Sequence, residues 1–159
     1  MTLASTLFGY IIGLPMGIVL TVTDKDGIRP NAAVYKVLDV ISNLLRSIPF
    51  IILLIVLIPF TRFVVGRSYG STATIVPLTI AAAPYIARMV ESSLKEVDAG
   101  VIEAARSMGA SDFQIVTKVM LVEARTSLIV GATISLGTIL GYSAMAGTVG
   151  GGGLGDIAI

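Results

Sequence analysis

The chain has 159 residues, of which 55% are hydrophobic and only 13% are charged, and its mean hydropathy is +0.93. A soluble domain carries about a quarter charged residues, so this composition excludes an ordinary water-soluble globule and favours a protein surrounded by a lipid bilayer. The absence of Cys and His excludes thiol chemistry, histidine bases and Cys/His metal sites, and a net charge of +1 gives no indication of a nucleic-acid partner.

Four apolar segments predict a single all-α transmembrane domain over residues 1–159. About twenty helical residues extend roughly 30 Å, which matches the hydrocarbon thickness of a bilayer. The predicted spans cover residues 2–23, 48–65, 71–90 and 126–145. In the first span, Gly9, Gly13 and Gly17 share one helix face, which predicts close packing against another helix. Gly137 and Gly141 repeat this spacing in the fourth span.

The distribution of Lys and Arg predicts the orientation of the chain. Nine of the eleven lie in residues 24–47 and 88–125, and the other two are Arg62, at the end of the second span, and Arg67, in the turn that follows it. By the positive-inside rule, the two longer segments face the cytoplasm, and the N-terminus and the glycine-rich residues 147–155 face outward. Residues 34–48 have the spacing of an amphipathic helix. Arg88 and Glu91 have the spacing of an ion pair, either a boundary anchor or a gate.

The polar stretch 91–122 predicts two helices joined by a sharp turn. Asp98 is a suitable N-cap, Gly109 is suited to end the helix in a left-handed conformation, and Ser111 with Gln114 fits a capping box. We therefore expect a helix of about ten residues, a glycine turn and a second helix. A short capped helix in a cytoplasmic loop is either a surface filler or a docking element for a soluble partner, and spacing alone leaves both open.

A family resemblance bears on this choice. The run Glu103-Ala104-Ala105, with Gly109 a few residues later, resembles the EAA loop of ABC importer permeases. Further segments resemble the permeases of methionine uptake. They are residues 13–17, 46–54, 58–62, 83–91 and 141–145. The resemblance implies an all-α integral membrane protein with the helical bundle of type I ABC importers, truncated at both ends relative to the family.

The resemblance also implies the biological setting and the site. It implies a homodimeric permease of the bacterial plasma (inner) membrane, two ATPase subunits, an external substrate-binding lipoprotein and D- or L-methionine as cargo. The docking helix would present five residues to the ATPase: Glu103, Ala104, Ala105, Gly109 and Ala110. The chain has no phosphate-binding loop of the G-x-x-x-x-G-K-[ST] type, so ATP and Mg would belong to the partner, and the chain would not be an enzyme by itself.

Three residues near the outer end of the fourth span are candidates for the translocation pathway. Tyr142, Ser143 and Met145 lie among small residues that allow helices to approach a central pathway, and a flexible Met145 suits a plug. Ordinary helix packing is the alternative interpretation.

Two departures from the family affect the expected helices. Val122 and Thr126 stand where the family usually has proline, which predicts a helix that continues from about Ser111 into the fourth span. Three other functions stay open: a permease for another small amino acid, a non-ABC channel or a membrane scaffold. No predicted span contains an isolated Asp, Glu or Lys, which argues against an ion-coupled transporter.

Overall fold

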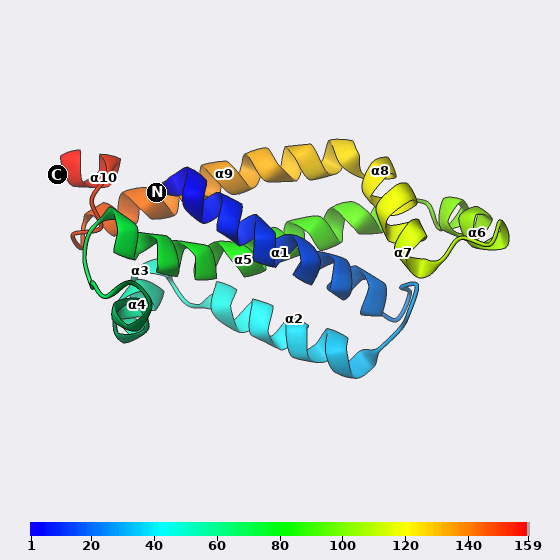
Figure 1. Cartoon of the computed structure of the whole chain (residues 1–159), viewed down its shortest axis with the longest axis horizontal. Helices are drawn as coiled ribbons and strands as arrows, with labels where there is room; N and C mark the ends of the chain where they lie inside the picture. The colour runs from blue at the N-terminus through cyan, green and yellow to red at the C-terminus, as the bar shows by residue number, and fades with distance from the viewer. Residues whose placement is uncertain (159) are drawn as a thin grey trace.

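Two long helices pack side by side at the centre of the computed structural model, which describes residues 1–158 (Figure 1). They are α1 (Thr2–Thr23) and α5 (Ser71–Lys95). A Cβ atom added to Gly13 would lie 2.7 Å from the Ala83 carbonyl oxygen, and one added to Gly17 would lie 2.6 Å from that of Ala87. Only glycine permits so close an approach, which confirms the predicted packing face of the first span.

The other elements surround this pair. The described chain contains helices and no strand, and its remaining helices are α2 (Ala32–Ser47), α3 (Phe50–Val56), α4 (Ile58–Val65), α6 (Ala99–Ser107), α7 (Asp112–Gln114), the π-helix η1 (Ile115–Met120), α8 (Leu121–Glu123), α9 (Arg125–Gly147) and α10 (Leu154–Ile157). Helices α2 and α9 both pack against α1 and α5. The predicted amphipathic helix is therefore α2, which packs against neighbouring helices.

Three described helices are long and apolar enough to cross a membrane, namely α1, α5 and α9. A fourth crossing is possible only if α2 and α3, which meet at an angle of 103°, form one bent span. The expected second span over residues 48–65 is thus not a single helix. Pro49 holds Ile48 in an extended conformation (φ −82°, ψ 124°), and Pro59 has no N–H to donate to the carbonyl of Ile55.

One further expectation, about the helix that leads into α9, is corrected, and another stays a prediction. The helix that begins after Ser111 is interrupted at Ala124 (φ −83°, ψ 3°), although neither family proline is present. Ala124 is buried in the same core as Ile115 and Met120, so the break lies at a packed position and does not require proline. Gly137 and Gly141 have no atom of residues 1–158 within 4 Å of an added Cβ, so the close packing predicted for them stays a prediction of contact with another chain.

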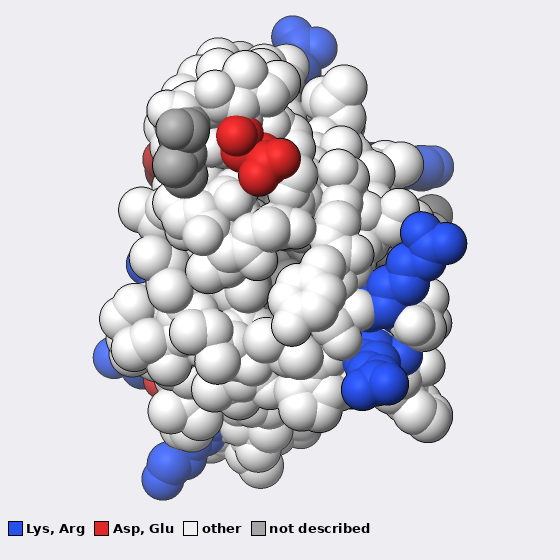
Figure 2. Space-filling model, turned by 90° about the vertical axis from the view of Figure 1, so that its left-hand side faces the viewer, with Lys and Arg blue, Asp and Glu red and all other residues white. Residues whose placement is uncertain are grey.

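The two ends of the bundle differ in charge. The turn after α1 and the α6 region lie at one end, and the N-terminus, α10 and the end of α9 lie at the other (Figure 1). Figure 2 views the second end, which is mostly uncharged. The two Lys/Arg-rich segments, residues 24–47 and 88–125, thus begin at the same end, as the predicted topology requires. The first segment includes α2, which runs from this end along the side of the bundle.

The glycine contact between α1 and α5 predicts the effect of a larger side chain. Gly17→Val should lower the stability of the purified protein by about 1–3 kcal/mol, because the new methyl groups overlap α5. Gly137→Val is the matched control, since a Cβ added there meets open space among the described residues, and should change stability by less than about 1 kcal/mol. Thermal unfolding in detergent measures both. Equal melting temperatures for the two variants would contradict the assigned contact.

Candidate functional site

The helix α6 has defined caps at both ends. The Gly100 N–H donates to the Asp98 carboxylate at 2.9 Å, which satisfies the N-terminus. At the other end, Gly109 has a φ of +85°, and the Ala110 N–H donates to the Ala105 carbonyl at 3.1 Å. This is the pattern of a Schellman motif, in which a left-handed glycine reverses the chain. The predicted helix and glycine turn are both confirmed.

A second capped helix follows immediately. The Gln114 N–H donates to the Ser111 hydroxyl at 3.3 Å, and the Ser111 N–H donates to the Gln114 side chain at 3.0 Å. The expected capping box is therefore present. Together, the two caps hold the Gly109 turn in one conformation at the end of the molecule.

The predicted docking residues do not all face the same way. Glu103, Ala104 and Gly109 are exposed and Ala110 is half-buried, but Ala105 is only 5% exposed and packs with the core beside η1. The side chain of Ala105 is therefore unavailable to a partner and braces α6 from behind.

Two large apolar side chains lie beside this turn and were not singled out from the sequence as docking residues. Met108 is 82% exposed and Phe113 is 77% exposed. Exposed apolar side chains on a rigid turn are suited to insertion into a partner's pocket. The sequence offered one signal for them: both residues lie within four positions of Gly109, where the chain was expected to reverse direction.

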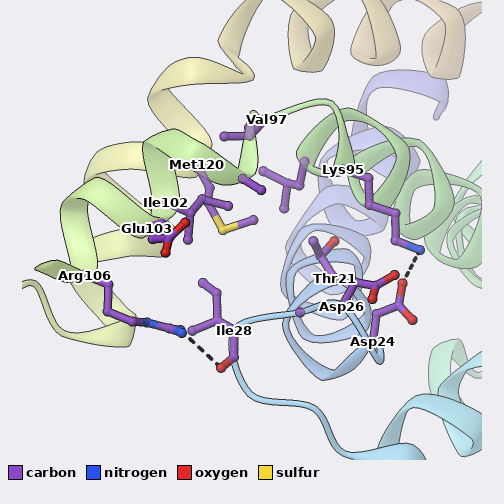
Figure 3. A pocket seen from close by; sticks show the side chains of 13 residues that line it. Thr21, Asp24, Asp26, Ile28, Lys95, Val97, Ile102, Glu103, Arg106 and Met120 are labelled. Atoms are coloured by element: carbon purple, nitrogen blue, oxygen red, sulfur yellow. Dashed lines mark hydrogen bonds and ion pairs between the residues drawn. The ribbon is translucent and has the colours of Figure 1, made fainter.

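A groove of about 660 Å³ separates α6 from the ends of α1 and α5 (Figure 3). Glu103 lines this groove. Arg106 crosses to the other wall and donates to the Ile28 carbonyl at 3.3 Å, while Arg29 pairs with Asp112 at 3.3 Å. These contacts tie α6 and α7 to the turn that follows α1.

A network of charges lies next to the groove on α5. Glu91, only 4% exposed, accepts hydrogen bonds from Arg88 at 2.7 Å, Lys95 at 2.8 Å and the Tyr35 hydroxyl at 3.2 Å. The expected pair of Arg88 and Glu91 is confirmed. Arg88 also pairs with Asp39 of α2. The network crosses from α5 to α2, which favours the boundary anchor over a gate.

The same network reaches the end of α1. Lys95 pairs with Asp24 at 2.7 Å, so one lysine joins α5 to the turn after α1. The hydrogen bond from Lys95 holds the pKa of Asp24 below its ordinary value of 3.8. Sequence reasoning missed Asp24, Asp39 and Lys95, because their partners are distant in the chain and only the folded structure brings them together.

The predicted pathway residues are separated on α9. Ser143 is 6% exposed and faces the protein interior, whereas Met145 is 47% exposed. The ring of Tyr142 stacks on Phe50 of α3, with 5.0 Å between the ring centroids. Of the three, only Met145 presents its side chain freely on the surface of this chain.

Comparison with known proteins places the chain in a family. The family described as "Binding-protein-dependent transport system inner membrane component" matches residues 9–159. The chain belongs to this family of transport permeases. It is therefore a multi-pass membrane protein and a permease component of an ABC transporter.

This permease is similar to curated relatives along nearly its whole length. It is 57% identical over 147 residues to the D-methionine transport system permease protein MetI of Salmonella typhimurium, covering 92% of this chain and 68% of the relative. It is 54% identical over 155 residues to the probable D-methionine transport system permease protein MetI of Pasteurella multocida, covering 98% of this chain and 71% of the relative. These matches confirm the resemblance seen in the sequence.

Solved structures confirm the fold class of this permease. An inward-facing structure of the MetNI methionine ABC transporter matches with a TM-score of 0.97 at 56% identity, covering 99% of this chain and 73% of that one. A crystal structure of an amino acid ABC transporter with histidines matches with a TM-score of 0.72 at 25% identity, covering 99% and 72%. The all-α ABC permease bundle is thus confirmed.

The Asp24–Lys95 contact predicts a pH dependence. A lowered pKa in the folded state stabilises that state above the ordinary pKa, and the stabilisation is lost as pH falls through the lowered value. Asp24→Asn should therefore lower the melting temperature at about pH 7, and the difference from the parent should shrink towards about pH 3. Asp26→Asn, on the same turn but exposed, is the control. A difference independent of pH would contradict this assignment.

Proposed function

We propose that this chain is the membrane-spanning subunit of an ATP-driven importer for methionine in the bacterial inner membrane. It acts as a homodimer beside two copies of a separate ATPase, which binds ATP and Mg, and receives its cargo from an external substrate-binding lipoprotein. Identity of 54–57% to MetI permeases and the fit to a methionine ABC transporter support this assignment. A permease for another small amino acid is the alternative.

The docking proposal depends on the geometry of α6. The helix and its Gly109 turn project at the end of the bundle, with Glu103 and Met108 exposed and both helix ends capped. A docking element needs exposed anchors on a rigid support, because ordering a loose loop would reduce the binding free energy. We assign the ATPase-facing role to Glu103, Ala104, Gly109, Ala110 and Met108, with Ala105 as the internal brace.

Coupling follows from the contacts behind the docking helix. Ala105 lies in the same buried cluster as Ile115 of η1, α6 contacts η1, and Arg106 bonds to the turn after α1. A force that moves α6 is therefore passed to α1 and to the start of the helices that lead into α9. ATP-driven closure of the ATPases would move the two docking helices and switch the spans between inward-open and outward-open states. The ATPase can drive this switch only if it binds the docking helix with a different free energy in the two states.

Co-purification tests the docking proposal. Full-length protein carrying Glu103→Lys and Met108→Asp should lose its ATPase partner in detergent, because the first change reverses an exposed charge and the second places a charge at an apolar contact. Glu123→Lys is the control, since Glu123 is exposed on α8 and makes no ion pair within residues 1–158. Retention of the ATPase by the double variant would refute docking at α6. If no ATPase co-purifies with the unmodified protein, a channel or a scaffold would be favoured.

A leak assay tests the pathway proposal. Met145 is exposed on α9, and we propose that it plugs the closed pathway. In proteoliposomes, Met145→Ala should raise the ATP-independent efflux of methionine, because a smaller side chain leaves the gap unfilled. Ile129→Ala, another exposed apolar position on α9, is the control. A leak from the Met145 variant no greater than that of the parent would rule out the plug.

A further inference from the structure

An arginine lies deep along the bundle, where α2 meets α3. Tyr35 of α2 pairs with Glu91 of α5, and Asp39 and Asn43 pair with Arg88, so later residues of α2 meet earlier residues of α5. Following this register, Arg46 lines a cavity together with Ala81 and Tyr85. The sequence had placed Arg46 in a cytoplasmic segment, but the structure places it about one helical turn beyond Asn43, beside Ala81 and Tyr85 of α5.

The depth of Arg46 follows from the packing of α1. The middle of this 22-residue helix is near Gly13, which lies against Ala83 and Ile86 of α5. The cavity that Arg46 shares with Ala81 and Tyr85 is therefore level with the middle of a spanning helix. The surrounding headgroups are roughly 15 Å away in either direction. A cation at this depth is costly unless it faces a polar space, and such residues mark transport pathways.

Arg46 has no carboxylate partner within residues 1–158, in contrast to Arg88, which pairs with two. The residue is exposed in the single chain, which leaves it open to a ligand. A guanidinium presents a planar set of donors that matches a carboxylate. An accessible, unpaired arginine at this depth is therefore suited to bind a carboxylate that comes from elsewhere.

The cavity beside Arg46 measures about 170 Å³. This volume is below the range of about 300–1,000 Å³ for drug-sized ligands, so it suits a small one. One wall is the stacked pair of Phe50 and Tyr142, and Leu53 adds an apolar surface. The Tyr85 hydroxyl lies 3.3 Å from that of Thr138 and adds a polar group near the arginine. The lining thus combines one cation, hydroxyl groups and an apolar, aromatic wall.

We propose that this cavity is a transit site for the amino-acid cargo, in which Arg46 binds the α-carboxylate and the Phe50–Tyr142 wall contacts the side chain. The inference rests on the proposed function, since it assumes that an amino acid crosses this chain. It assigns a direct cargo contact to the permease itself and gives Tyr142 a role as a wall of the site. Arg46 would favour free amino acids over analogues whose carboxylate is neutralised.

Binding of labelled methionine to the full-length permease–ATPase complex, without the binding protein, tests the inference. Methionine should compete and methioninamide should not. Arg46→Gln should weaken binding about tenfold or more, the loss expected for a hydrogen bond between charged groups. Arg67→Gln, which removes an arginine that makes no ion pair among residues 1–158, is the control and should leave binding unchanged. Arg46→Lys should restore part of the affinity.

The outcomes separate the inference from the proposed function. A parent complex that imports methionine in proteoliposomes, but binds it equally well with Arg46→Gln, would overturn the transit site alone. A parent that imports no methionine would overturn the proposed function. Equal competition by methioninamide would also overturn the role of Arg46, and this test needs no variant to fold. Loss of the permease dimer in Arg46→Gln would instead assign Arg46 to a carboxylate of the second copy.

Discussion

The close approach of α1 and α5 is the constraint on which the rest of the structure depends. Three glycines on one face of α1 bring its backbone against α5, and at Gly13 and Gly17 even a methyl group would overlap carbonyl oxygens. Helices in lipid gain little from the hydrophobic effect, so such backbone contact supplies packing that side chains alone would not. This contact fixes the register of α5, and α5 in turn carries Glu91, Arg88 and Lys95 to the level of α2 and of the turn after α1.

The charge network turns this packing into a support for the docking helix. Glu91 is buried and its charge is compensated by two cations, Arg88 and Lys95, so removal of both would leave an uncompensated buried carboxylate. Through Asp39 and Asp24, the network holds α2 and the end of α1 against α5. Arg106 and Arg29 then join α6 and α7 to that same turn. In this account, α6 can transmit a displacement because its neighbours are fixed.

Local signals predicted some parts of this structure well and others poorly. Asp98, Gly109 and Ser111 determined the caps of α6 and α7 because capping depends on a few adjacent residues. The glycine face of α1 was also predictable, since its period is local. The division of residues 48–65 was not, because hydropathy alone does not register the effect of Pro49 and Pro59. The depth of Arg46 and the partners of Lys95 depend on the register between distant helices, which one sequence does not reveal.

The central claim is that the Gly109 turn contacts the ATPase. Since these 159 residues contain no cysteine, Met108→Cys adds one attachment point to them, and a photo-crosslinker can be attached there before the permease is assembled with the ATPase. The account predicts a crosslink to the ATPase from position 108, with a yield that changes when ATP is bound. Phe63→Cys, an equally exposed position on α4, should give none. Absence of the crosslink at 108, or an equal yield at 63, would contradict the claim.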